Sequence, residues 1–150
     1  MRINIINPKY LTDNHLIAEY RETKMATAYY VKSSRTKTGI DKSRISKRYT
    51  LNKGHGYMWY DKMNFLKKRF DSLVEEMRDR GFQTNFTELN FTNIPEEAFG
   101  DFEPNQEDKK INLDRTLIRI AKQPLWYKYR GKNIKDWNSF YLDLFKEEKL

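Results

Sequence analysis

The clearest pattern of hydrophobic and polar positions runs from residue 58 to residue 80. Its apolar residues recur four and three positions apart in turn, which is the period of an α-helix with one buried face. The residues of this stripe are Trp59, Met63, Leu66, Phe70, Leu73 and Met77. Gly81 follows as a stop signal, so we predict a helix over 58–80 and interpret its aromatic residues as part of the core.

Three further helices are predicted from weaker patterns. Residues 13–31 contain no glycine or proline, and we expect Asp13 to be the N-cap of a helix there. A helix over 107–122 cannot continue far, because Pro124 lacks the required N–H group. Residues 137–145 place their apolar side chains on one helical face, so we expect a short amphipathic helix that docks either on the body of the protein or on a second copy.

Two long segments between these helices lack a sustained period. Residues 32–56 are rich in hydroxyl and basic side chains and are predicted to form an irregular connection that faces phosphate. Residues 82–105 carry aromatic residues and an acidic tail, which we interpret as an ordered loop with a solvated flank. The sequence therefore predicts an all-α fold with a compact three-helix core, long irregular loops and an extra short C-terminal helix. We expect one domain over residues 1–150, in which residues 136–150 are the extra helix.

The composition excludes several kinds of site. There is no cysteine, so disulfides, zinc–thiolate sites and thiol nucleophiles are excluded. His15 and His55 are the only histidines, too few for a clustered histidine metal site, although carboxylates alone can hold Mg²⁺. We therefore predict a site without metal or cofactor. No apolar run approaches the ~20 residues that span a bilayer, and the N-terminus lacks a signal-peptide pattern, so we expect a cytoplasmic protein with no membrane contact.

The positive charge is concentrated in the first third of the chain. Residues 1–54 hold 12 Lys or Arg against 4 Asp or Glu, a balance of 12 − 4 = +8, which equals the net charge of the whole chain. Residues 55–150 hold 17 of each sign and are neutral. We expect a polyanion to bind the N-terminal third, because cations that neutralise phosphates release condensed counterions. The alternative is a basic surface that only keeps the protein soluble.

Aromatic and basic residues alternate over residues 126–132. Such a segment either stacks on exposed bases while it grips phosphate, or anchors the C-terminal part of the chain on the protein. The pattern alone leaves both interpretations open.

Five blocks of sequence, in this order, resemble the pyrimidine-dimer DNA glycosylases of the phage endonuclease V type. The blocks are Met1 to Asn4, His15 to Glu22, Gly54 to Arg69 (with Gly54-His55, Tyr60-Asp61-Lys62 and Phe65 to Arg69), Arg80 to Phe82, and Pro124 to Lys132. They cover nearly the whole chain up to about residue 135. The resemblance implies a single all-α glycosylase domain that is also an abasic-site lyase, works without a metal, and acts on double-stranded DNA containing a lesion. We expect the protein to be a monomer. It also implies kinked DNA with the base opposite the lesion turned out of the stack.

The resemblance also implies the catalytic groups. In that family the amine of a threonine, exposed when the initiator methionine is removed, attacks the sugar, and Arg-Ile-Asn follows it. Here Arg2-Ile3-Asn4 follow Met1 directly, so we expect Met1 to be retained and to supply the α-amine nucleophile. An α-amine is useful because its ordinary pKa is near ~7.8, against ~10.4 for a lysine. Glu22 matches the catalytic carboxylate; its spacing alone favours a partner for nearby cations on the helix surface.

The DNA-binding residues are likewise implied by the resemblance. Arg21 matches an arginine that contacts the lesion nucleotide, while Met25 replaces the family's next arginine and Lys24 is a possible substitute. The residues that match phosphate-gripping positions are Arg2, Arg115 and Arg119, and those of the substrate-recognition segment are Trp126, Tyr127, Lys128, Tyr129 and Lys132. We expect His15 to pack beside the chain terminus, and His55 either to touch the DNA backbone or to end a loop.

Two alternatives to this function remain open. The same fold can act on another modified or damaged base, because residues 32–53, Met25 and Arg130 fall where selectivity is set. It can also bind DNA without catalysis. Trapping of the enzyme on damaged DNA distinguishes all three.

Overall fold

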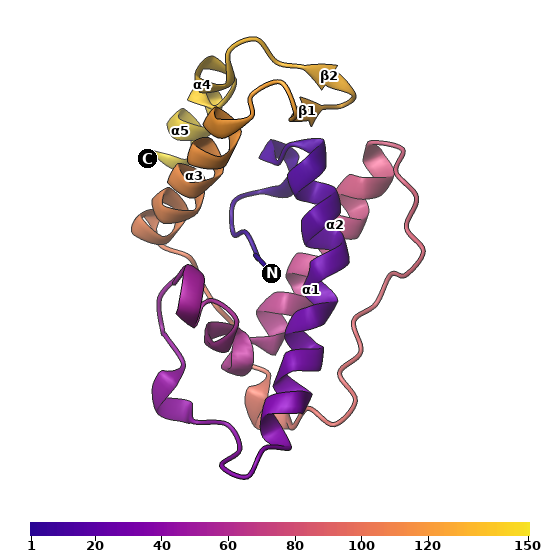
Figure 1. Ribbon diagram of the computed structural model, residues 1–150, viewed down its shortest axis with the longest axis vertical. Helices are drawn as coiled ribbons and strands as arrows, with labels where there is room; N and C mark the ends of the chain where they lie inside the picture. Colours follow the sequence, from indigo (N-terminus) through magenta and orange to yellow (C-terminus); the bar gives the residue numbers. More distant parts are fainter.

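The computed structural model describes residues 1–150 and is mostly helical, which confirms the predicted all-α class (Figure 1). A two-stranded antiparallel hairpin is the only sheet. The elements are α1 (Asp13–Ser34), α2 (Met63–Asp79), α3 (Gln106–Lys122), β1 (Lys128–Tyr129), β2 (Lys132–Asn133), α4 (Trp137–Phe140) and α5 (Leu142–Glu148), with five short 3₁₀ turns between them. No helix is both long and apolar enough to cross a bilayer.

The N-terminal segment runs inside the molecule, between α1 and α3 (Figure 1). Its isoleucines explain this path, because Ile3, Ile5 and Ile6 are all buried and join the two hydrophobic clusters of the core. Helices α1 and α2 pack along each other beside this segment. The first residue of the chain thereby lies beside residues of α1 and α3.

The start of α1 differs from the prediction. Thr12, not Asp13, is the N-cap: its backbone is extended and its hydroxyl accepts the His15 N–H at 3.0 Å. Asp13 already has helical geometry, and its carboxylate accepts the N–H groups of Arg130 and Gly131 at 3.0 and 2.8 Å. The residue predicted to cap the helix therefore attaches the C-terminal hairpin to α1.

The second helix is shorter than predicted. A 3₁₀ turn over Tyr57–Asp61 precedes it, and Lys62 breaks the helical geometry with φ −127° and ψ 37°. The Lys62 ammonium is buried, where it donates to the carbonyl oxygens of Ser46 and Met58 at 2.7 Å each. The apolar stripe nevertheless stays in the core across this break, and Gly81 at φ +81° ends the helix region as predicted.

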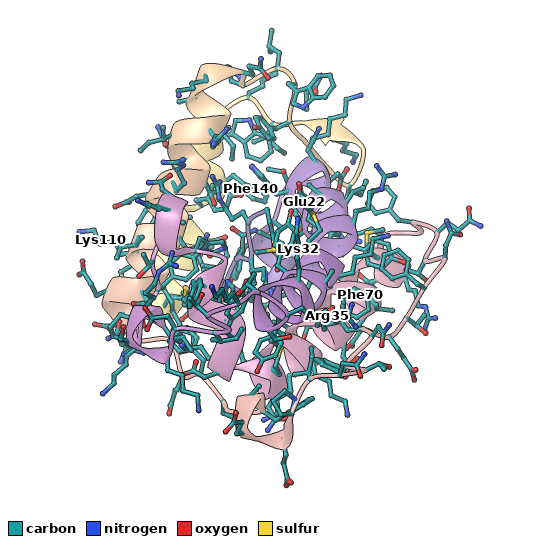
Figure 2. All side chains as sticks on the ribbon, turned by 60° about the horizontal axis from the view of Figure 1, so that its bottom comes forward. Glu22, Lys32, Arg35, Phe70, Lys110 and Phe140 are labelled. Carbon is teal, nitrogen blue, oxygen red and sulfur yellow. The ribbon has the colours of Figure 1, made fainter.

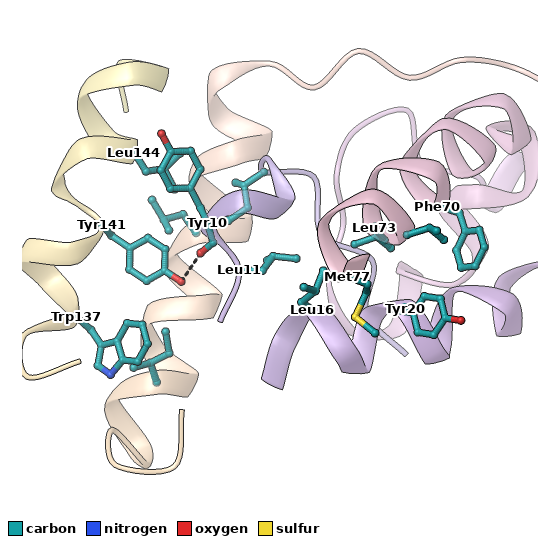
Figure 3. Close-up of a cluster of buried hydrophobic side chains, with 14 residues drawn as sticks. Tyr10, Leu11, Leu16, Tyr20, Phe70, Leu73, Met77, Trp137, Tyr141 and Leu144 are labelled. Carbon is teal, nitrogen blue, oxygen red and sulfur yellow. Dashed lines mark hydrogen bonds between the residues drawn. The ribbon is translucent and has the colours of Figure 1, made fainter. Parts of the chain in front are cut away.

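The C-terminal tail docks on the body of its own chain. It forms two short helices, α4 and α5, in place of the single one predicted over 137–145. The Tyr141 hydroxyl donates to the Tyr10 carbonyl at 2.8 Å (Figure 3), and Trp137 Nε1 donates to the Pro124 carbonyl at 3.2 Å. Leu144 is fully buried in the same cluster. The tail thus extends the core formed by α1, α2 and α3.

Leu144→Ala is expected to lower the free energy of unfolding by about 2–5 kcal/mol, because it leaves a cavity in a packed cluster. Leu142→Ala in the same helix is the control: this side chain is 50 % exposed, and its loss is expected to cost about 0.5 kcal/mol or less. Chemical denaturation measures both. Equal, small effects would mean that the tail does not unfold together with the body.

Candidate active site

The N-terminus and α1 meet at a cavity of about 310 Å³. The residues that line it include Met1, Arg2, His15, Glu22, Arg119 and Tyr127. Five of these six were predicted as catalytic or DNA-binding residues. They come from the N-terminal segment, α1, α3 and the segment after α3, so only the tertiary fold brings them together.

A buried ion pair fixes the N-terminal segment against α1 and α2. The Arg69 guanidinium donates to both carboxylate oxygens of Glu19, at 2.7 and 2.9 Å, and to the Ile6 carbonyl at 2.5 Å. Glu19 is 1 % exposed and Arg69 is 6 % exposed. This two-pronged geometry is what a buried pair needs to offset the loss of hydration. The sequence contains one sign of this buried ion pair: Arg69 follows Leu66 by three positions, which places a charged residue on the apolar face of the predicted helix.

Asn112 on α3 holds the same segment from the other side. Its Oδ1 accepts the Ile5 N–H at 2.7 Å and the Ile6 N–H at 3.3 Å, and its Nδ2 donates to Asn4 Oδ1 at 2.7 Å. Asn4 in turn donates to Glu19 Oε1 at 2.8 Å. The N-terminal segment is therefore hydrogen-bonded to all three long helices, and sequence reasoning missed this network.

His55 is buried, at 4 % exposure, and both of its ring nitrogens bond to groups of the protein. Its Nε2 accepts the Ile3 N–H at 2.8 Å, and its Nδ1 lies 2.8 Å from the Thr50 carbonyl, so Nδ1 carries the proton. Burial lowers the pKa of His55 to about 4. The neutral ring is therefore the form that binds Ile3.

His15 packs beside the chain terminus, as predicted. Its ring stacks on Tyr127 with centroids 4.7 Å apart, and its Nδ1 is 2.8 Å from the Thr12 hydroxyl. Burial, followed by the positive charges of Arg2 and Arg119, lowers the pKa of His15 to about 4. It is therefore neutral at physiological pH and adds no charge to the cavity.

Three arginines, Arg2, Arg115 and Arg119, concentrate positive charge at this end of the protein. Burial and the positive charges of Arg119 and Arg115 lower the pKa of Arg2. None of the three makes an ion pair with a carboxylate. Arg115 donates to Asn52 Oδ1 at 3.1 Å, while its Nε is buried without a partner. Mutually repelling cations held in place without counter-charges favour binding of phosphate groups.

Glu22 is the half-buried carboxylate of this cavity, and it makes no ion pair with the neighbouring arginines. Arg21 and Lys24 lie outside the cavity on the exposed side of α1, where the Lys24 ammonium sits 4.8 Å from the Phe86 ring centre. Lys32 near the end of α1 and Arg35 at its C-cap are also exposed (Figure 2). Helix α1 therefore presents two carboxylates to the cavity, Glu19, which is paired with Arg69, and the unpaired Glu22, and it presents a row of cations to solvent.

Comparison with protein families agrees with this arrangement. The family model of pyrimidine dimer DNA glycosylases matches residues 1–89, which is more than half of the chain. The chain belongs to the pyrimidine dimer DNA glycosylase family. The match includes the N-terminal segment, α1 and α2, and with them Met1, Arg2 and Glu22. Membership makes the protein a DNA glycosylase and DNA its substrate class.

In this glycosylase the segment after α3 divides between two roles. Trp126 is 64 % exposed, whereas Tyr127 reaches the cavity. Asn14 at the start of α1 positions both, since its Oδ1 accepts the Lys128 N–H at 3.0 Å and its Nδ2 lies 3.5 Å from the Trp126 carbonyl. Tyr127 therefore lines the cavity, while the neighbouring Trp126 side chain is exposed to solvent.

The hairpin of β1 and β2 was not predicted. Its turn residues Arg130 and Gly131 both have positive φ, +50° and +79°, as in the tight turns that join short antiparallel strands. Tyr129 packs on the body, with its hydroxyl donating to the Lys9 carbonyl at 2.8 Å, while Lys128 and Lys132 are exposed. The segment thus both anchors the C-terminal part and presents basic side chains.

Proposed function

We propose that this glycosylase acts on cyclobutane pyrimidine dimers and is also an abasic-site lyase, with the α-amine of Met1 as nucleophile and Glu22 as catalytic carboxylate. The observation that carries the proposal is the shared cavity: Met1 and Glu22 line it together, beside Arg2 and Arg119. Nucleophile, proton carrier and phosphate-binding groups are the set that this chemistry requires.

The first step replaces the glycosidic bond with a carbon–nitrogen bond. The amine lone pair attacks C1′ of the damaged nucleotide as the bond to the base breaks, and the bonding electrons leave with the base. The nitrogen then loses a proton, and O4′ gains one as the sugar ring opens to an imine. We assign both transfers to the Glu22 carboxylate, which also stabilises the positive charge that develops on the sugar.

The second step cuts the strand. The imine withdraws electrons from C2′, so a base removes a C2′ proton and an enamine with a C1′–C2′ double bond forms. The nitrogen lone pair then restores the imine, the C1′–C2′ electron pair becomes a C2′–C3′ double bond, and the C3′–O bond breaks with the phosphate as leaving group. Water then releases the sugar and restores the amine. Arg2, Arg115 and Arg119 are proposed to hold the phosphates on both sides of the reacting sugar. The scheme needs only proton transfers and a nucleophile, so we propose no metal or cofactor.

We propose that the protein works as a monomer on double-stranded DNA. Trp137, Tyr141 and Leu144 of the C-terminal tail are buried against the body of the same chain. These apolar side chains are therefore not available to bind a second copy of the protein.

Borohydride trapping tests the proposed function. Reduction of the imine is expected to join the protein covalently to ultraviolet-irradiated duplex and to duplex with an abasic site. Intact-mass and peptide analysis of the adduct is expected to place the sugar on Met1. Adducts with abasic DNA alone would indicate another target base, and the absence of both adducts would indicate a DNA-binding protein without catalysis.

A further inference from the structure

One residue, Ile3, is held at both of its backbone polar groups by side chains of a single segment. The Ile3 N–H donates to His55 Nε2 at 2.8 Å, and the Ile3 carbonyl accepts from the Tyr49 hydroxyl at 2.7 Å. All three residues are buried, at 0 %, 4 % and 3 % exposure for Ile3, His55 and Tyr49. These two bonds do not belong to any helix or sheet.

The segment that supplies these side chains is itself rigidly placed. Asp108 on α3 accepts the Tyr49 N–H at 3.0 Å, and the ring of His55 lies edge-on to Tyr49 and Trp59, with centroids 5.5 and 5.7 Å apart. Because Nδ1 of His55 is directed at the Thr50 carbonyl, its Nε2 is left as an acceptor aimed at Ile3. The ring orientation and its protonation state are therefore both set from within the segment.

Ile3 is the last residue whose backbone is hydrogen-bonded before the chain terminus, and beyond it the Met1 side chain packs partly against the core. Residues 4–6 are held by Glu19, Arg69 and Asn112, but the nitrogen of Met1 is reached only through Arg2 and Ile3. Without the two bonds to Ile3, three residues would separate the amine from its last anchor and let it move over about 10 Å, whereas a displacement of about 1 Å is enough to slow a reaction of aligned groups 100-fold. Terminal residues are ordered only where something ties them down.

We propose that Tyr49 and His55 are positioning residues that aim the α-amine of Met1 at the sugar by clamping Ile3. The inference rests on the proposed function, since it assigns a task to residues that touch neither DNA nor the reacting atoms. It also explains the composition of the connection after α1: its basic part, residues 35–48, mostly faces solvent, while its last part, residues 49–56, supplies the side chains that hold Ile3. Asn52 in the same stretch holds Arg115 at 3.1 Å, so one segment orients both the terminal amine and a phosphate-binding cation.

The test separates the rate of imine formation from DNA binding. In Tyr49→Phe the carbonyl bond is lost at nearly unchanged volume, and the single-turnover rate of trapping on saturating abasic duplex is expected to fall about tenfold. In His55→Leu the acceptor for the Ile3 N–H is lost, and the rate is expected to fall about 100-fold. His55→Gln keeps an acceptor oxygen and is expected to recover part of this loss. The Kd for abasic duplex is expected to stay within about twofold in all three variants, because the cations that hold phosphate are untouched.

Tyr141→Phe is the matched control. Like Tyr49→Phe, it removes a buried hydroxyl that donates to a backbone carbonyl. Here the hydroxyl of Tyr141, on the C-terminal tail, donates to the Tyr10 carbonyl at 2.8 Å, away from Ile3. Its Tm is expected to fall as much as that of Tyr49→Phe while its trapping rate stays at the wild-type value. Exchange of the Ile3 amide proton is a second measurement, expected to accelerate in His55→Leu and not in Tyr141→Phe.

The proposed function and the role of Tyr49 and His55 fail on different results. If the wild-type protein forms no adduct at Met1, the proposed function is wrong and the positioning role falls with it. If the wild-type protein is trapped at Met1 but Tyr49→Phe and His55→Leu are trapped at the wild-type rate, the positioning role alone is overturned. The positioning role is also overturned if the trapping rates of Tyr49→Phe and His55→Leu fall only in proportion to their affinity for DNA. It is overturned as well if the trapping rate of Tyr141→Phe falls by the same factor.

Discussion

A lysine inserted between Met1 and Arg2 is expected to abolish imine trapping, whereas a glycine inserted at the same place is expected to preserve it. Methionine aminopeptidase removes an initiator methionine before a small residue and leaves it before a large one. The glycine variant therefore loses its methionine and presents a glycine amine where the Met1 amine stood. The lysine variant keeps it and moves the amine by one residue, about 3.5 Å, and a loss of at least about 100-fold is expected from such a displacement.

The two insertions add one residue at the same position, but only the lysine insertion moves the terminal amine. A difference between their trapping rates therefore reports the position of the amine. Intact mass verifies the processing of each protein, and the rate of borohydride trapping on abasic duplex measures the outcome. Both variants are expected to bind abasic duplex like the wild-type protein, since Arg115 and Arg119 are distant in sequence from the change. Equal trapping rates in the two variants would show that a different amine, such as that of a lysine, attacks the sugar.

Glu22→Gln is expected to slow imine formation and strand cutting by about 10²–10⁴-fold while leaving the affinity for damaged DNA unchanged or slightly higher. The amide keeps the size of the side chain but can neither carry a proton between O4′ and the nitrogen nor stabilise a cationic sugar. Because the carboxylate makes no ion pair in the folded protein, its removal is expected to leave the free energy of unfolding nearly unchanged. Loss of one negative charge beside Arg2 and Arg119 favours DNA binding.

Glu75→Gln makes the same chemical change on an exposed position of α2 and serves as the control. Single-turnover cleavage of a duplex with one defined pyrimidine dimer, together with a binding isotherm, measures both variants. Wild-type cleavage by Glu22→Gln would remove Glu22 from the mechanism. If weaker binding of DNA accounted for the whole loss of cleavage rate, Glu22 would be a DNA-contacting residue instead.

The helices were predictable because their signals are local. The apolar stripe through Leu66, Phe70 and Leu73 needs only its own spacing to indicate a buried face, and Pro124 limits α3 wherever that helix lies. Local signals did not set where α1 and α2 begin. Lys62 lies just before α2 with its ammonium bonded to buried carbonyl groups, and Thr12 caps α1 while the Asp13 carboxylate bonds to the hairpin.

The sequence by itself determined the all-α class, the basic first third and, through ordered blocks that resemble a family, the pairing of Met1 with Glu22 as candidate catalytic groups. Only the tertiary structure decided how the N-terminus is held. Asn112 bonds to Ile5 across 107 positions of sequence, Arg69 bonds to Glu19 across 50, and His55 bonds to Ile3 across 52. Side-chain periodicity reports which face of an element is buried, but a buried polar group is satisfied by whatever partner the packing of other elements brings to it. The cavity therefore becomes visible only once three helices and one loop have closed around the first residues of the chain.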